Sequence, residues 1–290
     1  MCAPEVMASV RQQVRRGRGV DRRRLIGGAG VIAAAGAFAP FRGLSQGATP
    51  IATPLASGGT ISFESIVNLS HSLTPESPVW PDRPPFQLEA ATTVAVEGFY
   101  ANILTYHEHV GTHIDAPAHF VDGGDTVDVI APERLVAPLV VLDVTAQAEA
   151  DEDYAVSVDD ILAWESEYGP LPDGAFVAFT SGWDARFSDA EAFVNIDAQG
   201  VQHYPGFAPE AAVFLVEQRS IVGIGTDTLS QDPGNSTDFG THVAILGAGL
   251  YGIEGAANLG AVPASGATVI VGAPNHAGGS GGPTRLLAFV

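Results

Sequence analysis

The sequence contains no lysine and has little positive charge of any kind after its first 42 residues. All 13 basic residues are arginine, and eight of them lie within residues 1–42. From residue 43 onward, five arginines stand against 31 acidic residues. Such an acidic chain repels a phosphate backbone, so the composition argues against binding to nucleic acid. The acidic fraction itself is ordinary, which favours a GC-rich codon bias over adaptation to high salt as the cause of the imbalance.

Cysteine is also nearly absent, since the chain has only Cys2. A single cysteine excludes a disulfide within the chain and any metal site built from several cysteines. Charged residues make up 16% of the sequence and hydrophobic residues 46%, so disorder of the whole chain is excluded. The 290 residues, with 34 glycines and 20 prolines, suffice for one large domain or two small ones rich in turns.

The beginning of the chain resembles an export signal. Three arginines at residues 22–24 precede a short apolar run, and residues 37–39 match an A-x-A cleavage site. This order is typical of a secretory signal, and the consecutive arginines resemble the twin-arginine type. The apolar run is shorter than the length that a membrane-spanning helix usually needs. We predict a signal segment at 1–42, a flexible linker at 43–59 and export to the periplasm or the cell exterior. An uncleaved anchor and a start at Met7 are the alternatives.

The remaining residues, 60–290, are predicted to form one domain in which strands and helices alternate. Ser157 and Asp160 form a capping box, which predicts the start of one helix, and Pro209 predicts the start of another. Short apolar runs predict strands at residues 61–70, 86–96, 139–144, 175–180, 221–225, 268–271 and, as an edge strand, 286–290. The sequence has no internal repeat. This pattern predicts a mixed α and β fold.

Histidines are concentrated in one short segment: four of the eight lie at His107, His109, His113 and His119. Gly111 and Pro117 argue against a regular helix there. In an extended chain His109, His113, Asp115 and His119 share one face. A straight strand would spread these four side chains over about 33 Å. The chain must therefore bend at the glycine and the proline to gather them around a metal ion. Imidazole and carboxylate ligands suit Zn²⁺ or Mn²⁺; a solvated loop and hydrogen-bonded core histidines are the alternatives.

Further candidate ligands lie downstream, where His242 and Glu254 bracket an almost purely apolar stretch. A carboxylate in such surroundings must be paired, protonated or bound to metal. Asp227 and Asp232 form a polar loop after a predicted strand. They are either turn-forming residues or partners of the metal ligands.

Two glycine-rich motifs carry no function of their own. Residues 247–252 match G-x-G-x-x-G, but no acidic residue follows Glu254, so a dinucleotide fold is unsupported. Residues 278–282 match the nucleophile elbow G-x-S-x-G around Ser280. No acid or histidine follows that serine, so the hydrolase order Ser…Asp…His cannot be completed, and we interpret the segment as a glycine loop.

These residues together resemble the cyclase and kynurenine formamidase family of metal-dependent hydrolases. The family signature H-x-G-T-H-x-D-x-P-x-H is matched at every fixed position from His109 to His119. Weaker similarities extend over about residues 62–290 and include Trp80-Pro81. The resemblance implies that residues 60–290 form one metal-dependent hydrolase domain. It also implies a single α+β domain with a mixed, barrel-like sheet and flanking helices, of the swivelling β/β/α type.

The resemblance also implies roles for the candidate residues. The implied metal ligands are His109, His113, Asp115, His242 and Glu254. His119 is implied to be the catalytic base and acid. The implied cofactor is one or two Zn or Mn ions. Some relatives, such as isatin hydrolases, carry Gln at the position of Glu254. The additional negative charge of the glutamate favours two ions over one. Asp82 departs from the glycine that many relatives have there.

The activity implied by the resemblance is hydrolysis of an aromatic amide, either an aryl formamide such as N-formylkynurenine or a cyclic amide such as isatin. Four aromatic residues are candidates for the wall of a substrate pocket: Trp80, Phe99, Tyr100 and Trp183. Trp80 and Trp183 are the predicted substrate contacts, and packing in the core is the alternative for each of the four. The alternatives are a metal-assisted cyclase or dehydratase and an exported, non-enzymatic binding module. We expect a small-molecule substrate, no nucleic acid, no stable membrane span after cleavage, and a homodimer or homotetramer.

Overall fold

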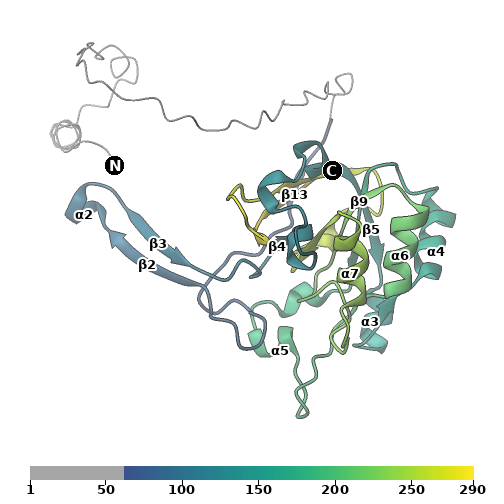
Figure 1. Cartoon of the computed structure of the whole chain (residues 1–290), viewed down its shortest axis with the longest axis horizontal. Coiled ribbons are helices and arrows are strands. Elements are labelled where there is room, and N and C mark those ends of the chain that lie inside the picture. Colours follow the sequence, from purple (N-terminus) through teal and green to yellow (C-terminus); the bar gives the residue numbers. More distant parts are fainter. Residues whose placement is uncertain (1–61) are drawn as a thin grey trace. The chain divides into compact units, whose positions relative to one another are not determined.

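The computed structural model of the chain describes residues 62–290 (Figure 1). The predicted signal segment and linker, within residues 1–59, lie outside the described residues. Among the residues that are described, no helix combines the length and hydropathy that a membrane crossing needs. The described chain separates into the segment Ala90–Asn102 and a larger body formed by Ser62–Glu89 and Ile103–Val290. The candidate site lies in this body.

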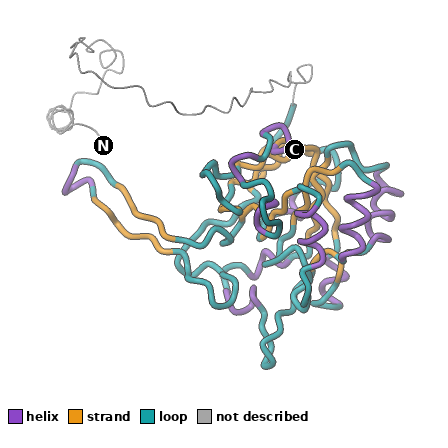
Figure 2. Tube along the Cα trace, viewed as in Figure 1, coloured by secondary structure: helices purple, strands orange, loops and turns teal. Residues whose placement is uncertain are grey.

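A nine-stranded mixed sheet forms the centre of the body (Figure 2). Its spatial order is β1 (Ile66–Asn68), β13 (Arg285–Phe289), β11 (Ala267–Gly272), β5 (Val136–Asp143), β7 (Ala175–Thr180), β9 (Ile221–Gly225), β10 (Tyr251–Glu254), β4 (His113–Asp115) and β12 (Gly281–Pro283). The four strands β5, β7, β9 and β10 are parallel to one another. All other pairs in this sheet are antiparallel.

Helices fill the connections between the parallel strands, because parallel neighbours need a crossover that returns the chain to the same end of the sheet. In chain order they are α3 (Thr145–Ala150), α4 (Val158–Tyr168), α5 (Ala190–Val194), α6 (Pro209–Gln218) and α7 (Gly240–Gly247). The predicted capping box is present at Ser157, whose hydroxyl accepts from the Asp160 backbone N–H. Pro209 is the first residue of its helix, as predicted.

Short 3₁₀ helices occupy several loops of the body. They are η2 (Pro117–His119), η3 (Val127–Val129), η4 (Pro132–Leu135), η5 (Trp183–Arg186) and η6 (Leu259–Ala261). Two further strands, β6 (Ala155–Val156) and β8 (Gly206–Phe207), pair in parallel outside the main sheet. Of these elements, η2 matters most for function because it carries part of the histidine motif.

Alternate residues of the central strands enter two separate cores. Leu139 and Val141 of β5 pack on one face of the sheet, whereas Val140 and Leu142 pack on the other. This alternation is the period of two that an extended strand imposes. The first core is built mainly from strand residues, with loop and 3₁₀ residues such as Val127 and Leu259 closing it, which fits a sheet curled into a half-barrel around it. The second core is covered by helices through Ile161, Ala211, Leu215 and Ile245.

A separate hairpin is formed by β2 (Gln87–Thr92) and β3 (Ala101–Thr105), with the single-turn helix α2 (Val94–Glu97) between them. Many of its large apolar side chains are exposed in the single chain. These are Leu88, Val94, Val96, Phe99, Tyr100, Ile103 and Leu104. A two-stranded hairpin is marginally stable by itself.

The predicted mixed α and β fold with flanking helices is confirmed, and the predicted strands at 175–180 and 221–225 coincide with β7 and β9. The prediction that residues 286–290 form an edge strand is wrong. That strand, β13, lies between β1 and β11 and is hydrogen-bonded on both sides. Its burial within the sheet depends on the strand order, which the local sequence does not specify.

Candidate metal centre and active site

The site lies where parallel strands of the sheet end. Loops leave the carboxyl ends of β7, β9 and β10 at the same edge, which is the usual place for ligands in sheets of this kind. Strand β4 runs antiparallel to β10, so the start of β4 meets the end of β10. His113 begins β4 and lies directly opposite Glu254, the last residue of β10. Two chemically active residues that are far apart in sequence thereby become cross-strand neighbours.

The predicted bend of the histidine motif is present. Gly111 has φ +63°, and a Cβ at this position would collide with the Leu73 side chain. The left-handed turn brings His109 back toward β4, where its Nδ1 lies 2.6 Å from Asp115 Oδ1. After the strand, Pro117 begins η2 and folds the chain again. The last histidine of the motif therefore lies on the same cluster rather than at the far end of a straight strand.

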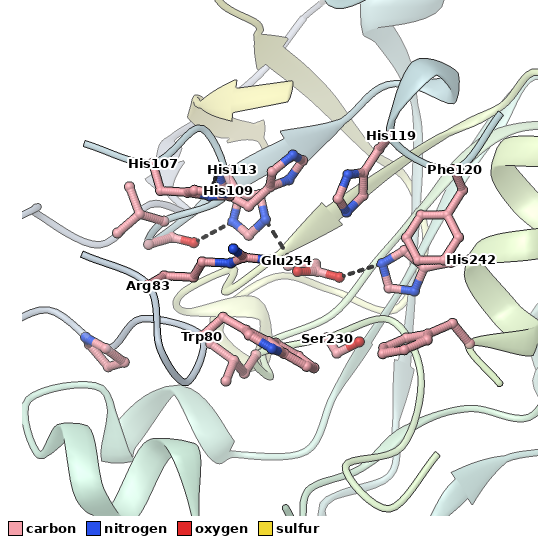
Figure 3. Close-up of a pocket in the computed structure, with 15 residues that line it drawn as sticks. Trp80, Arg83, His107, His109, His113, His119, Phe120, Ser230, His242 and Glu254 are labelled. Atoms are coloured by element: carbon pink, nitrogen blue, oxygen red, sulfur yellow. Dashed lines mark hydrogen bonds and ion pairs between the residues drawn. The ribbon is translucent and has the colours of Figure 1, made fainter. Parts of the chain in front are cut away.

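The contribution of α7 is His242, near the start of that helix. Asp232 caps the helix by accepting from the Thr241 backbone N–H at 2.7 Å, and it also accepts from His242 Nδ1 at 2.5 Å. The opposite ring atom, Nε2, lies 3.0 Å from Glu254 Oε1 and 3.4 Å from Asp115 Oδ2. The five predicted ligands and His119 are thus gathered at one place, and Figure 3 shows four of these ligands, His109, His113, His242 and Glu254, together with His119.

The hydrogen bonds around three imidazoles leave their inner nitrogens without a proton. His113 Nδ1 donates to the Gly111 carbonyl at 2.9 Å, and His242 Nδ1 donates to the Asp232 carboxylate. The Nε2 atom of His109 lies 3.0 Å from Ser280 Oγ, whose own proton goes to a carboxylate. Each outer nitrogen is therefore the donor, and each inner nitrogen presents a lone pair to the centre of the cluster.

These inner lone pairs face two buried carboxylates. His113 Nε2 has no hydrogen-bond partner, although it lies 3.4 Å from Asp115 and 3.2 Å from Glu254. Lone pairs and negative charges cannot be left together in a buried site without positive charge between them. The donor set, imidazole nitrogen and carboxylate oxygen, is the set that divalent Zn or Mn prefers. The residues present therefore fit a metal ion.

The same demand for positive charge appears in the pKa of His113. Burial opposes its charged form, but the nearby carboxylates of Asp115 and Glu254 together outweigh burial and raise the pKa to about 10 when no metal is bound. Burial likewise opposes the ionised form of Asp115, yet the surrounding histidines, with His109 first, hold the pKa of Asp115 well below its usual range. The cluster therefore requires a positive charge, either a proton or a metal ion. Of these two, only a metal ion can be shared by all the candidate ligand atoms.

His119 differs from the other histidines of the motif. Its ring stacks on His109 with centroids 3.8 Å apart, and among residues 62–290 it makes no hydrogen bond. Burial lowers its pKa to about 4, against the weaker opposing effect of Asp115. At neutral pH this imidazole is therefore a neutral base with a free lone pair beside the cluster.

Two residues near the ligands were not singled out from the sequence. Gln231 donates from Nε2 to Asp115 Oδ2 at 2.7 Å and packs over Gly252. Glu108 accepts from the hydroxyl of Ser280 at 2.6 Å. The segment that was interpreted as a glycine loop thus supports His109 through Ser280. The sequence contained only a weak indication of Gln231. This residue lies between Ser230 and Asp232, in the loop where only the aspartates were named as candidates.

The two aspartates left open by the sequence have different roles. Asp232 supports His242, as described above. Asp227 accepts from the backbone N–H and the hydroxyl of Ser181 at 2.8 and 2.6 Å and from the backbone N–H of Trp183 at 3.2 Å. Burial raises the pKa of Asp227 to about 6, against the lowering effect of these hydrogen bonds. This residue anchors the loop after β7 rather than the metal ligands.

A cavity of about 220 Å³ opens onto the cluster. One side carries the histidines and Glu254, and the opposite side carries the aromatic rings of Trp80 and Phe239, whose centroids are 6.1 Å apart. Phe120 adds a third ring, 5.7 Å from Phe239. The cavity also contains Arg83 (Figure 3). The volume and the lining of the cavity suit a small planar molecule.

Of the predicted substrate contacts, Trp80 lies in the cavity wall but Trp183 does not. The ring of Trp183 is 2% exposed and packs in a separate core cluster. Its indole N–H donates to the Phe193 carbonyl at 2.9 Å, and Arg186 lies over the ring. The expectation for this residue is therefore corrected: its size and burial serve packing. Two other aromatic candidates, Phe99 and Tyr100, belong to the hairpin segment and do not line the cavity.

Comparison with known proteins places these features in a family. The model of the Cyclase family matches residues 67–233. Isatin hydrolase of Roseibium aggregatum is 36% identical over 201 residues, which cover 66% of this chain and 76% of the relative. Kynurenine formamidase of Salinibacter ruber is 27% identical over 193 residues, covering 66% of this chain and 82% of the relative.

A solved structure agrees with this result. Isatin hydrolase A from Labrenzia aggregata, bound to benzyl benzoate, has a TM-score of 0.74 at 35% identity, with coverage of 78% of this chain and 93% of that one. The similarity therefore extends well beyond the histidine motif. From the family match, the sequence identity and the shared structure together, this chain belongs to the Cyclase family.

Proposed function

We propose that this chain is a metal-dependent hydrolase that cleaves the C–N bond of an aromatic amide, either an aryl formamide such as N-formylkynurenine or a cyclic amide such as isatin. The relatives named above are hydrolases of these two kinds. The observation that carries the proposal is the convergence of three imidazole lone pairs and two buried carboxylates at one wall of an aromatic cavity. A divalent ion held there polarises an amide carbonyl and lowers the pKa of water.

The residues divide into those that hold the ion and one that moves the proton. The proposed ligands are His109, His113, Asp115, His242 and Glu254. Two three-residue groups with ligand atoms within 4.8 Å share Asp115: one contains His109 and His113, the other His119 and His242. Because these two groups overlap, the cluster has donor atoms enough for one or two ions, and Zn or Mn are the proposed metals, with His119 kept as the proton carrier rather than a ligand.

His119 is proposed as the general base and acid. Its unprotonated ring faces the cavity without a hydrogen bond inside the described chain, so it can take a proton from the attacking water and return it to the leaving nitrogen. The aromatic rings on the opposite wall would hold the substrate ring and exclude bulk water. Trp80 is the proposed contact among the residues predicted from the sequence.

Variants of two histidines test the division of roles. His113→Ala should lose bound metal and activity, as measured by metal analysis of the purified protein and by amide hydrolysis. His119→Ala should keep the metal and lose about 10²–10⁴-fold in kcat. Loss of metal in His119→Ala would make it a ligand, and a metal-free wild type with full activity would refute the mechanism.

The pH dependence supplies an independent check on His119. Since its pKa is lowered to about 4, this base stays unprotonated through the neutral range. We expect that its protonation does not reduce kcat/KM above about pH 5 in metal-saturated enzyme. An acidic limb near pH 6.5 that vanishes in His119→Gln would contradict this assignment.

The isotopic composition of the product separates hydrolysis from the alternatives. In ¹⁸O-labelled water, hydrolysis places one solvent oxygen in the released acid. A cyclase or dehydratase would instead close a ring or remove water without this label. A binding module would bind the amide with no turnover, and His119→Ala would leave its affinity intact.

We also propose that the chain forms a homodimer or homotetramer. The exposed apolar side chains of the β2–β3 hairpin support this, since Val96 is 75% and Tyr100 61% exposed in the single chain. Light scattering should give a mass of two or four chains. Val96→Glu should lower that mass, whereas Val213→Glu, at an exposed position of α6, should not.

Export by the twin-arginine route is likewise proposed, on the basis of the sequence of residues 1–42. Replacing residues 22–24 by Lys should retain the full-length protein inside the cell, as followed by fractionation. Export that persists without these arginines would refute the route.

A further inference from the structure

Arg83 is a cation in the cavity to which the proposed hydrolysis gives no role. It lines the same cavity as the histidine cluster, and its guanidinium points inward between Trp80 and the imidazoles (Figure 3). Arg83 is exposed overall in the single chain, but in a body with so few basic residues an arginine that lines the cavity beside the histidine cluster calls for an explanation.

A tight turn fixes the position of Arg83. Its backbone N–H donates to the Trp80 carbonyl at 3.0 Å. Pro81 occupies the second position of this turn, and Asp82, with φ +64°, occupies the third. A proline followed by a positive φ is the type II pattern, which usually has glycine at the third position. The turn brings its first and last residues close together, and both of these, Trp80 and Arg83, line the cavity.

Three of the other four arginines of the body have the partners that Arg83 lacks, and the fourth, Arg285, is exposed on β13. Arg134 donates to the carbonyls of residues 222 and 249, Arg186 pairs with Glu152 and Arg219 pairs with Glu165. Within residues 62–290, the guanidinium of Arg83 makes neither a hydrogen bond nor an ion pair. Its five N–H donors are available to a ligand.

The acids of the cluster do not neutralise Arg83. Glu254 lies 3.2 Å from His113 and 3.0 Å from His242, Asp115 lies against His109, and neither carboxylate forms an ion pair with Arg83. One divalent ion balances these two carboxylates. The cavity then keeps the uncompensated positive charge of Arg83 and attracts an anion.

We propose that Arg83 binds a carboxylate carried by the aromatic amide substrate. The planar guanidinium matches a carboxylate with two parallel hydrogen bonds, and the neighbouring rings of Trp80 and Phe239 accept a flat ring. The cavity of about 220 Å³ corresponds to about seven water molecules at roughly 30 Å³ each, which suits one ring or a fused pair with short substituents. This inference rests on the proposed amide hydrolysis, which it extends by naming the charge of the substrate.

A matched set of substrates tests the charge requirement. The three isomers of formamidobenzoate carry an anion, and formanilide is the same aryl formamide without it. The wild type should show a KM at least about tenfold lower for one isomer than for formanilide. Arg83→Gln should raise that KM about tenfold and leave the KM for formanilide unchanged. Arg83→Lys should restore part of the effect, and Arg285→Gln, at an exposed position on β13, should have none.

Binding without turnover provides the second measurement. Benzoate should bind the wild type more tightly than Arg83→Gln by about tenfold, whereas benzamide should bind both alike. Equal benzoate affinity of the two proteins, with metal content and unfolding temperature preserved, overturns the role of Arg83. So does a variant that loses activity equally toward all four formamides.

The two proposals fail in different ways. If the wild type hydrolyses none of the amides, the proposed function is wrong, and the benzoate comparison still decides whether Arg83 binds an anion. If the wild type hydrolyses formanilide and the three benzoates with the same KM, and Arg83→Gln does not alter this, amide hydrolysis stands and the anion subsite is refuted.

Discussion

Ser280 connects the glycine-rich segment near the C-terminus to the histidine cluster. Its hydroxyl donates to Glu108 and accepts from the Nε2 of His109, so the glutamate indirectly fixes which ring nitrogen of the histidine keeps its lone pair. Gly281 makes the contact possible, because a Cβ there would lie 2.8 Å from His109 Cε1 and 2.3 Å from the Ile114 carbonyl oxygen. A serine in a nucleophile-like sequence context thus serves to orient His109, a proposed metal ligand.

Removing this hydroxyl should weaken metal binding. Ser280→Ala leaves the His109 ring free to rotate and to change tautomer, and changes of this kind lower metal affinity by about 10–100-fold. Competition with a chelator of known affinity measures the effect without reference to turnover. Ser188→Ala, at an exposed position, is the control. Unchanged affinity in Ser280→Ala would show that Asp115 alone positions the ring.

At the scale of elements, the pairing of β4 with β10 assembles the site. The register sets Glu254 opposite His113 and Gly252 opposite Asp115. The glycine is required there, because a Cβ would lie 2.0 Å from the Gln231 amide nitrogen, which donates to Asp115. The strand pair therefore positions both the ligands and a residue that supports them.

Two glycine variants in adjacent elements should have opposite effects. Gly252→Ala displaces the Gln231 side chain, so it should lower the free energy of unfolding by about 1–3 kcal/mol and weaken metal binding. Gly247→Ala, at the end of α7, meets no atom within 4 Å and has no positive φ, so it should stabilise by about 0.4–1 kcal/mol. Denaturant unfolding measures both. Equal effects of the two changes would contradict the packing of Gln231 on β10.

For the molecule as a whole, the cluster concentrates unfavourable charge that a metal relieves. Asp115 is fully buried and Glu254 is 6% exposed in a chain that is already strongly acidic. The native state should therefore depend on metal for part of its stability, since an ion that binds only the folded chain stabilises it by mass action.

Removing the metal should lower the unfolding temperature. At a free metal concentration 100 times Kd the gain is about 2.7 kcal/mol, which for a body of this length corresponds to about 5–10 °C. Calorimetry with Zn or Mn added to chelator-treated protein measures the rise. His113→Ala should show little rise, and an equal rise in this variant would place the stabilising ion elsewhere.

How far the sequence predicted the site can be judged from its ligands. The bend at Gly111 and the start of η2 at Pro117 follow from local backbone preferences, so the grouping of the histidine motif was predictable. His242 and Glu254 were candidates because they bracket an apolar stretch, and resemblance to the family implied that they are ligands. The structure brings both to the same cluster; the roles of all these residues stay predictions. Trp183 was misjudged because an aromatic residue near a motif serves a core as readily as a pocket.

The sequence by itself determined the features that depend on near neighbours: the capped helices, the buried central strands, and an imidazole-rich segment bent by a glycine and a proline. Only the tertiary structure decided which distant residues support the site. Ser280 lies 171 residues from His109, and Gln231 lies 116 residues from Asp115. Such contacts depend on the order of strands in the sheet, and that order arises from burial of the whole apolar surface rather than from any local preference.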